Sequence, residues 1–154
     1  MPAQVDVADL AAWIAGIDFA LWPQQHRLED GKLRPAMVTD LAWHGFGERT
    51  DAFSKEIARG YLKAAHKVVY NRMLSVVMPG HSIPPHVDAQ ESDWIRRIHV
   101  PLVTNEKAYM IIDGVAEHWR AGQVYFIDTR VEHAIRNDGD TPRIHFMFDV
   151  RRAA

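Results

Sequence analysis

The chain has no cysteine, no long apolar run and little net charge, and each absence excludes a class of function. Without cysteine there is no disulfide, thiolate metal ligand or cysteine nucleophile, which suits a reducing compartment. Asp18 interrupts the apolar N-terminal segment, and no run approaches the ~20 apolar residues that cross a bilayer. A formal net charge of −2 creates no field that attracts nucleic acid. We therefore expect a soluble, cytoplasmic protein that binds neither nucleic acid nor a membrane.

The regular patterns divide the chain into two parts that we expect to form a single domain. Its 154 residues are a typical length for one domain. Residues 1–68 are helical and mixed, and apolar spacing predicts helices at residues 7–16 and 51–67. The turn-rich segment between these helices contains a candidate strand at residues 38–46. We expect this part to pack against the outside of a β-rich core formed by residues 69–150.

Short β-type runs follow one another from about residue 68, separated by breaks that contain glycine, asparagine or proline. Many short strands with little helix between them are typical of a sandwich or a barrel. The runs expected to be strands are 68–78, 96–103, 108–113, 115–120, 123–128, 132–137 and 143–150. The sequence therefore predicts a mainly β fold with N-terminal helices.

Several of these strands carry ionisable side chains on one alternating set of positions. These positions are Arg97 and His99 in one strand, and Arg143, His145, Met147 and Asp149 in another. For a single strand, such a face is more often exposed to solvent. For several strands of one small sheet protein, a cavity lined by polar side chains explains the pattern better.

The segment "PGHSIPPHVDAQ", residues 79–90, places His86 and Asp88 two positions apart. In a strand, residues two apart point to the same face, so this imidazole and this carboxylate could bind one metal ion. Two imidazoles and one carboxylate, with further positions open, form the facial triad of non-haem Fe(II) oxygenases. His133, at the start of a later β-type run, is the candidate third ligand. The alternative for His86 and Asp88 is a solvated pair at a strand end.

Arg143 is the candidate group for binding a carboxylate. A buried guanidinium presents a fixed fork of donors that matches a carboxylate, such as the distal one of 2-oxoglutarate. The alternative is that Arg143 pairs with Asp149 or Asp128 of the same chain. In that case Arg143 would not indicate a binding site for a ligand.

Four motifs in order resemble one known family. They are "LSVVMPGHSIPPHVD", "RRIHVPLVTN", "GVAEHWRAGQVYFIDTRVEHAIRN" and "TPRIHFMFDV". From about residue 72 to residue 150, the chain resembles the aspartyl/asparaginyl β-hydroxylase-like family of 2-oxoglutarate- and Fe(II)-dependent dioxygenases. Residues 1–70 are not covered by this resemblance.

The resemblance implies a double-stranded β-helix, which is a cupin-like jelly roll, and it implies roles for particular residues. His86, Asp88 and His133 would be the Fe(II) ligands and form the catalytic centre. Arg143 would bind the C5 carboxylate of the cosubstrate 2-oxoglutarate. Arg97 and His99 would be further groups near the cosubstrate.

The implied reaction uses O₂ to hydroxylate an unactivated C–H bond of an amino acid, an amino-acid derivative or a peptidyl aspartate or asparagine. Arginines near the expected site, namely Arg96, Arg130 and Arg136, would suit an acidic substrate, although scattered surface arginines are common. Two other functions stay open at this point. One is a cupin-type metalloenzyme that does not use 2-oxoglutarate, and the other is a barrel that binds a metal or ligand without turnover. Oligomeric state is not predicted.

Three further expectations concern structure rather than chemistry. Asp128 is expected to stabilise the turn before His133, or a neighbouring strand, rather than to contact substrate. Trp119 is expected in the core. Gly80 and Gly122 are expected in turns that need a positive φ.

Overall fold

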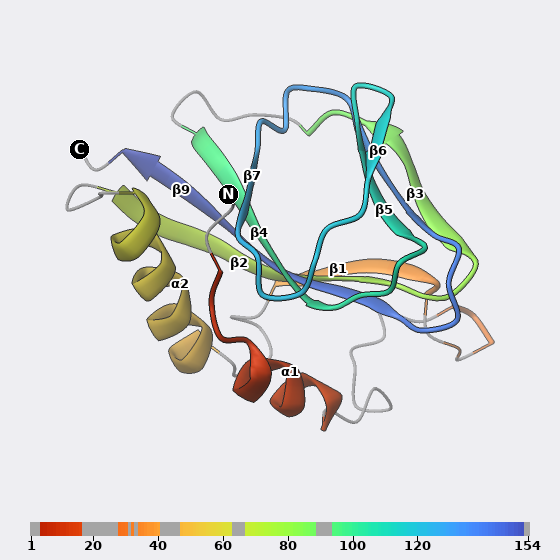
Figure 1. Ribbon diagram of the computed structural model, residues 1–154, viewed down its shortest axis with the longest axis horizontal. Helices are drawn as coiled ribbons and strands as arrows, with labels where there is room; N and C mark the ends of the chain where they lie inside the picture. Colours follow the sequence, from red (N-terminus) through yellow and green to blue (C-terminus); the bar gives the residue numbers. More distant parts are fainter. Residues whose placement is uncertain are drawn as a thin grey trace.

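The computed structural model describes residues 4–16, 28–30, 32, 34–40, 47–62, 67–88 and 94–152. Within these residues, two antiparallel sheets face each other and two helices cover the outside of the larger sheet (Figure 1). This is the jelly roll that the family resemblance implies, and it agrees with the sandwich or barrel that the strand pattern predicts. The order of elements also follows the prediction, with β1 (Ala36–Asp40) between the two helices and the other strands after them.

The larger sheet has the strand order β1, β2, β9, β4, β7, and the smaller sheet has the order β3, β8, β5, β6. The larger sheet consists of β1 (Ala36–Asp40), β2 (Lys67–Val77), β9 (Arg143–Arg152), β4 (Trp94–Val103) and β7 (Tyr125–Ile127). The smaller sheet consists of β3 (His81–His86), β8 (His133–Asn137), β5 (Ala108–Ile112) and β6 (Val115–Glu117). Strands that are far apart in the chain are therefore neighbours, as a jelly roll requires.

The two helices bury their apolar sides on the outer face of the larger sheet. The helices are α1 (Ala8–Ala15) and α2 (Gly47–Leu62), and Ile14 and Ile57 are each 1% exposed. They pack against the set of β9 side chains that includes Phe146 and Phe148. The opposite set of β9 side chains faces the smaller sheet, so both faces of this strand are buried.

Predicted boundaries differ most from the structure in the N-terminal part. The candidate strand at 38–46 is β1, which starts at Ala36 and ends at Asp40, and residues 41–46 lie outside the described residues. The second helix starts at Gly47, before the predicted start at residue 51, and it ends at Leu62. Residue 67, predicted as the helix end, is already the first residue of β2.

Strand β3 was missing from the predicted runs because it contains Pro84 and Pro85. Proline cannot donate to a ladder and is tolerated mainly on edge strands. β3 is the edge of the smaller sheet, and its pairing with β8 shifts register between Ile83 and His86. The prolines therefore occupy an irregular edge, and pairing resumes at His86.

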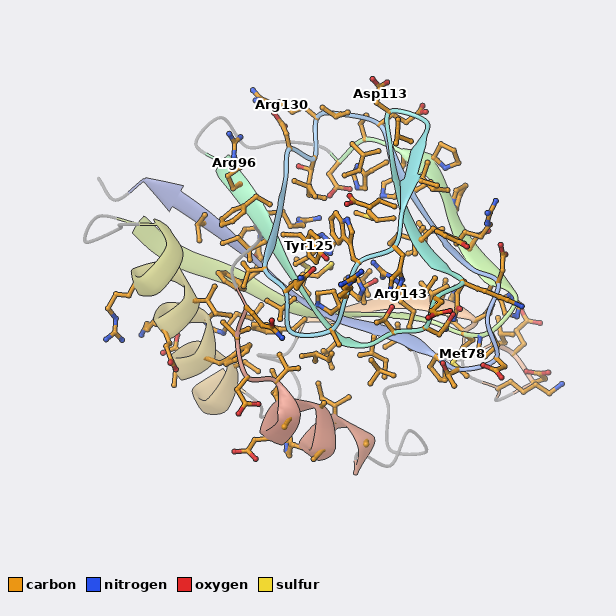
Figure 2. The ribbon with its side chains drawn as sticks, in the orientation of Figure 1. Met78, Arg96, Asp113, Tyr125, Arg130 and Arg143 are labelled. Carbon is orange, nitrogen blue, oxygen red and sulfur yellow. The ribbon has the colours of Figure 1, made fainter. Side chains whose placement is uncertain are left out.

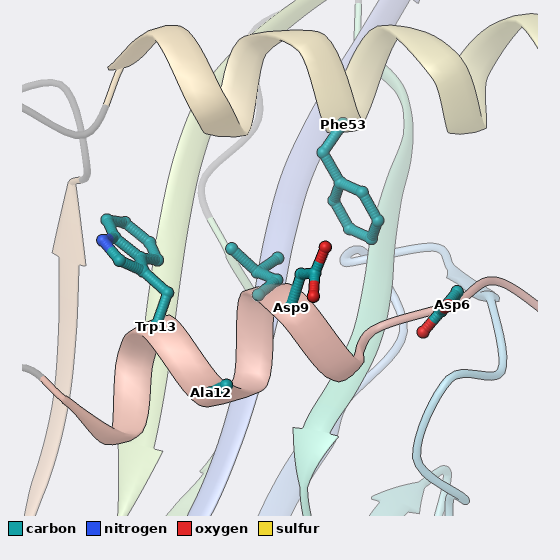
Figure 3. A pocket seen from close by; sticks show the side chains of 6 residues that line it. Asp6, Asp9, Ala12, Trp13 and Phe53 are labelled. Atoms are coloured by element: carbon teal, nitrogen blue, oxygen red, sulfur yellow. The ribbon is translucent and has the colours of Figure 1, made fainter.

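A groove of about 800 Å³ lies between the two helices, on the helical side of the larger sheet. Phe53 extends from α2 toward α1, which carries Asp9 and Trp13 (Figure 3). The described residues that line the groove include no histidine, so they form no mixed histidine and carboxylate donor set. No helix among the described residues is both long and apolar enough to span a bilayer.

Candidate metal centre

His86, Asp88 and His133 come together at one end of the barrel. One donor atom from each residue lies within 4.8 Å of the other two. The ladder between β3 and β8 explains this, because His86 is the direct cross-strand partner of His133. Their ring centroids are 4.3 Å apart. The three residues that the sequence singled out as metal ligands therefore form one cluster.

The two histidine rings are held so that the same nitrogen of each is available to a metal. Nδ1 of His86 is 2.7 Å from the carbonyl oxygen of Pro84, and Nδ1 of His133 is 3.0 Å from the carbonyl oxygen of Val131. A carbonyl only accepts, so each Nδ1 carries the proton and donates it. Each Nε2 then keeps a free lone pair, as metal-binding histidines require. The donor set therefore fits a divalent metal ion.

Asp88 is held from two sides. Its backbone N–H donates to the carbonyl of Thr129 at 3.0 Å, and its Oδ2 accepts a hydrogen bond from Nη1 of Arg97. The other carboxylate oxygen, Oδ1, lies 3.6 Å from Nε2 of His86. One oxygen of Asp88 is thus directed to the cluster, and the other to Arg97.

Arg143 is a buried cation that has no carboxylate partner within the described part of the chain. Its side chain is among the largest that are fully buried, and Figure 2 shows it inside the outline of the barrel. It donates to Nδ1 of His145 at 2.8 Å and to Oγ of Ser75 at 3.4 Å. Burial lowers the pKa of Arg143 to about 9. The guanidinium is therefore charged at neutral pH and has only neutral groups beside it.

Neither alternative pairing predicted for Arg143 is observed. Asp149 instead accepts hydrogen bonds from Arg97, at 2.8 and 3.1 Å. Asp128 instead binds Arg130, whose Nε lies 2.8 Å from Oδ1 of Asp128. Within the described residues, the buried charge of Arg143 therefore has no carboxylate beside it.

A cavity of about 250 Å³ extends from the histidine cluster to Ser75, which accepts a hydrogen bond from Arg143, but Arg143 itself does not line it. Ser75 and His99 line it on the larger sheet, and His86, Asp88 and His133 line it on the smaller sheet and its end. Both ring nitrogens of His99 are buried and have no hydrogen-bond partner in the described residues. Burial, together with the charge of Arg143, holds the pKa of His99 well below 6.5. An unpaired neutral imidazole in a cavity is suited to a polar ligand.

His145 fixes the orientation of Arg143 and belongs to a ring stack. Its Nδ1 accepts from Arg143, so its proton lies on Nε2. Burial and the Arg143 charge hold the pKa of His145 well below 6.5. The ring of Trp119 lies nearly parallel to the ring of His145. Trp119 also stacks on Tyr125, with ring centroids 4.2 Å apart. Trp119 is 3% exposed, which confirms its predicted place in the core.

Ser75 is the functional candidate that the sequence reading missed. It is 0% exposed, it lines the cavity, and it is the cross-strand partner of His145. The available signal was a single small polar residue within the otherwise apolar run "LSVVM". That signal is weak because a buried serine is usually satisfied by its own backbone.

The turn before His133 follows the expectation. The backbone N–H of Arg130 donates to Oδ1 of Asp128 at 3.0 Å, so Asp128 stabilises this turn. Gly80 and Gly122 have φ values of 75° and 78°, as predicted.

Arg130 is bound to Asp128 and Arg136 to Asp138, so neither presents an unbalanced positive charge to an acidic substrate.

The fold and the cluster define a jelly-roll protein with a candidate centre of two histidines and one carboxylate. The family model described as aspartyl/asparaginyl beta-hydroxylase matches residues 48–153, more than half of the chain. The chain therefore belongs to this family, as the resemblance of its motifs predicted. Family membership supports an oxidoreductase of the hydroxylase type.

Solved structures share this fold at low sequence identity. The non-heme alpha ketoglutarate dependent epimerase SnoN, from nogalamycin biosynthesis, is similar over 98% of this chain and 76% of its own, with a TM-score of 0.67 and 19% identity. The viral collagen prolyl hydroxylase of Paramecium Bursaria Chlorella virus-1 is similar over 77% of this chain and 78% of its own (TM-score 0.53, 11% identity). An oxidoreductase of the 2OG-Fe(II) oxygenase family from Burkholderia pseudomallei is similar over 73% of this chain and 55% of its own (TM-score 0.51, 16% identity). The comparison with curated proteins found no match.

Proposed function

We propose that the protein is a 2-oxoglutarate- and Fe(II)-dependent dioxygenase that hydroxylates an unactivated C–H bond. One observation carries the proposal beyond family membership. The barrel that holds the His86, Asp88 and His133 cluster also holds Arg143, a buried guanidinium with no carboxylate partner among the described residues. A buried charge without a partner is costly, so it indicates a site for an anionic ligand.

In this proposal, separate groups of residues bind the metal and the cosubstrate. His86, Asp88 and His133 would hold Fe(II), and Arg143 with Ser75 would bind the distal carboxylate of 2-oxoglutarate. His99 would offer a ring nitrogen to the polar end of the same molecule. When bound, the iron would supply the chemistry by which O₂ oxidises both the cosubstrate and the C–H bond. The protein holds these groups in fixed positions and surrounds them with apolar walls such as Met110, Ile135 and Met147.

The size of the cavity limits what can enter with the cosubstrate. Its volume of about 250 Å³ is below the ~300–1,000 Å³ typical of sites for drug-sized ligands. Once 2-oxoglutarate is bound, only a small group fits beside it. We propose that this group is a free amino acid or derivative, or a single side chain of a peptide whose backbone stays outside.

The test is an anaerobic absorbance titration with Fe(II) and then 2-oxoglutarate. Wild type should develop a visible charge-transfer band, and His86→Ala should not. Arg143→Met should need about 10–100-fold more 2-oxoglutarate, because hydrogen bonds to a charged group contribute about 1.5–3 kcal/mol. Arg136→Met is the matched control, because Arg136 pairs with Asp138 at the surface. It should behave like wild type.

Other outcomes would assign a different function. Fe(II) binding without any response to 2-oxoglutarate would indicate a cupin-type metalloenzyme with another chemistry. A band that forms normally but is never followed by succinate release, with any amino acid or peptide tested, would indicate a binding barrel. No metal binding by folded wild type would refute the proposal.

A further inference from the structure

Asp149 is a buried carboxylate with a clear structural partner but no role in the site described so far. Its side chain is 1% exposed. It accepts two hydrogen bonds from the fork of Arg97, at 2.8 Å from Nε and 3.1 Å from Nη2. Nδ2 of Asn71 also donates to it, at 3.2 Å. A fork held at two atoms has a fixed plane, so Asp149 determines the orientation of the Arg97 guanidinium.

The remaining arm of Arg97 points to the candidate metal ligand. Nη1 of Arg97 donates to Oδ2 of Asp88, while Oδ1 of Asp88 lies beside Nε2 of His86. With Oδ2 held by Arg97, Asp88 presents Oδ1 alone to the cluster. The guanidinium thus joins a wholly buried carboxylate to a partly exposed one at the metal site.

Two strand ladders position the residues that connect Asp149 to Asp88. Arg97 on β4 is the direct cross-strand partner of Asp149 on β9. Asn71 lies where the ladder between β2 and β9 shifts register, and its φ of 49° is left-handed. Such a bulge redirects a side chain, and here it coincides with the contact from Asn71 to Asp149.

We propose that Asp149 is a positioning residue for the metal carboxylate, acting through Arg97 so that Asp88 binds the metal through one oxygen. This inference rests on the proposed function, because it needs Asp88 to be a metal ligand. It gives Arg97 a role different from the cosubstrate contact that the family resemblance implies. A guanidinium already balanced by two carboxylates attracts a third one weakly, whereas Arg143 has none.

Metal affinity without turnover tests the inference. Ni(II) affinity is measured by competition with a chelating dye for wild type, Asp149→Asn and Arg97→Lys. Groups that orient a metal ligand typically change affinity by about 10–100-fold, and we expect both variants to lose affinity in this range. The matched controls Asp138→Asn and Arg136→Lys alter an ion pair at the surface and should leave the affinity unchanged.

Arg97→Lys keeps the charge and removes only the fork, so it also serves if Asp149→Asn does not fold. Its effect should disappear in an Asp88→Ala background, because the positioning acts through Asp88. An equal loss of Ni(II) affinity in both backgrounds would overturn the inference. So would an Arg97→Lys variant that binds Ni(II) normally and loses affinity only for 2-oxoglutarate.

The same Ni(II) measurement distinguishes failure of the proposed function from failure of the positioning role. If wild type binds Ni(II) no better than His86→Ala, the metal centre itself is absent and the role of Asp149 falls with it. If wild type binds Ni(II) and His86→Ala does not, the centre stands. Normal Ni(II) affinity of both Arg97→Lys and folded Asp149→Asn would then refute the positioning role alone.

Discussion

Replacing Arg143 with methionine should leave the metal-free protein as stable as wild type or more stable, although it removes a wholly buried side chain. Burial lowers the pKa of Arg143 from 12.5 to about 9. At about 1.4 kcal/mol per pKa unit, keeping this guanidinium charged in the barrel costs about 5 kcal/mol. Its hydrogen bonds to Ser75 and His145 offset part of that cost. The substitution removes the cost and leaves His145 Nδ1 unpaired, a penalty of about 1–3 kcal/mol.

Arg97→Met is the matched comparison, because it makes the same substitution on the same inner face. It would leave the buried carboxylate of Asp149 without its cationic partner, with only the hydrogen bond from Asn71 remaining. Breaking a buried ion pair in this way costs about 3–5 kcal/mol. The free energies of unfolding of the two variants should therefore differ by at least about 3 kcal/mol, with Arg143→Met the more stable.

Urea titrations of metal-free protein in the presence of a chelator, followed by circular dichroism, would measure these free energies. The slope of each transition checks that the denatured state is unchanged. A loss of about 3 kcal/mol or more in Arg143→Met would refute the reasoning, because it is the loss expected for a paired cation. Equal losses in the two variants would refute it in the same way.

Two further predictions use the same titration. Burial keeps the pKa values of His99 and His145 well below 6.5, so below pH 6.5 the unfolded chain binds more protons than the folded one. The free energy of unfolding should therefore fall as the pH is lowered from 6 to 5. His99→Phe should reduce the slope of this free energy against pH by about 1.4 kcal/mol per pH unit. An unchanged slope would contradict the lowered pKa of His99. Gly122→Ala should cost more than Gly80→Ala, because a Cβ at Gly122 would lie 2.8 Å from the carbonyl oxygen of Val5, whereas one at Gly80 meets nothing within 4 Å. We expect about 1 kcal/mol for Gly80→Ala and at least ~1 kcal/mol more for Gly122→Ala, and equal losses would show that the positive φ alone sets the cost.

The inner faces of β4 and β9 could be predicted from the sequence because strand alternation is local. Once residues 143–150 are assigned to a strand, period two places Arg143 and Asp149 on one face without further information. The cluster of His86, Asp88 and His133 was predictable for a different reason. Its residue types match a known donor set, and the order of the surrounding motifs matches a family.

The sequence alone could not predict which carboxylate pairs with which arginine. That pairing depends on the register between strands that are far apart in the chain. Alternation identifies which face Arg97 and Arg143 share, but a slide of two residues along the ladder preserves that face. The observed register places Asp149 opposite Arg97. Arg143 lies on the same strand as Asp149, about 20 Å away along it, and cannot pair with it in any register. β3 was missed because two prolines conceal a strand whose pairing with β8 is irregular.

That choice of register explains why two arginines of one barrel have different chemistry. Two carboxylates, Asp88 and Asp149, accompany Arg97, while Arg143 has only neutral partners among the described residues. These two carboxylates and two guanidinium groups cancel in number, but the positive charge of Arg143 is not balanced locally by any described residue. A divalent metal at the carboxylate side and a dianion reaching Arg143 would keep the total balanced and remove the local imbalance. Either one alone would leave two unbalanced charges in a low-dielectric interior, so under the proposed function each would favour binding of the other.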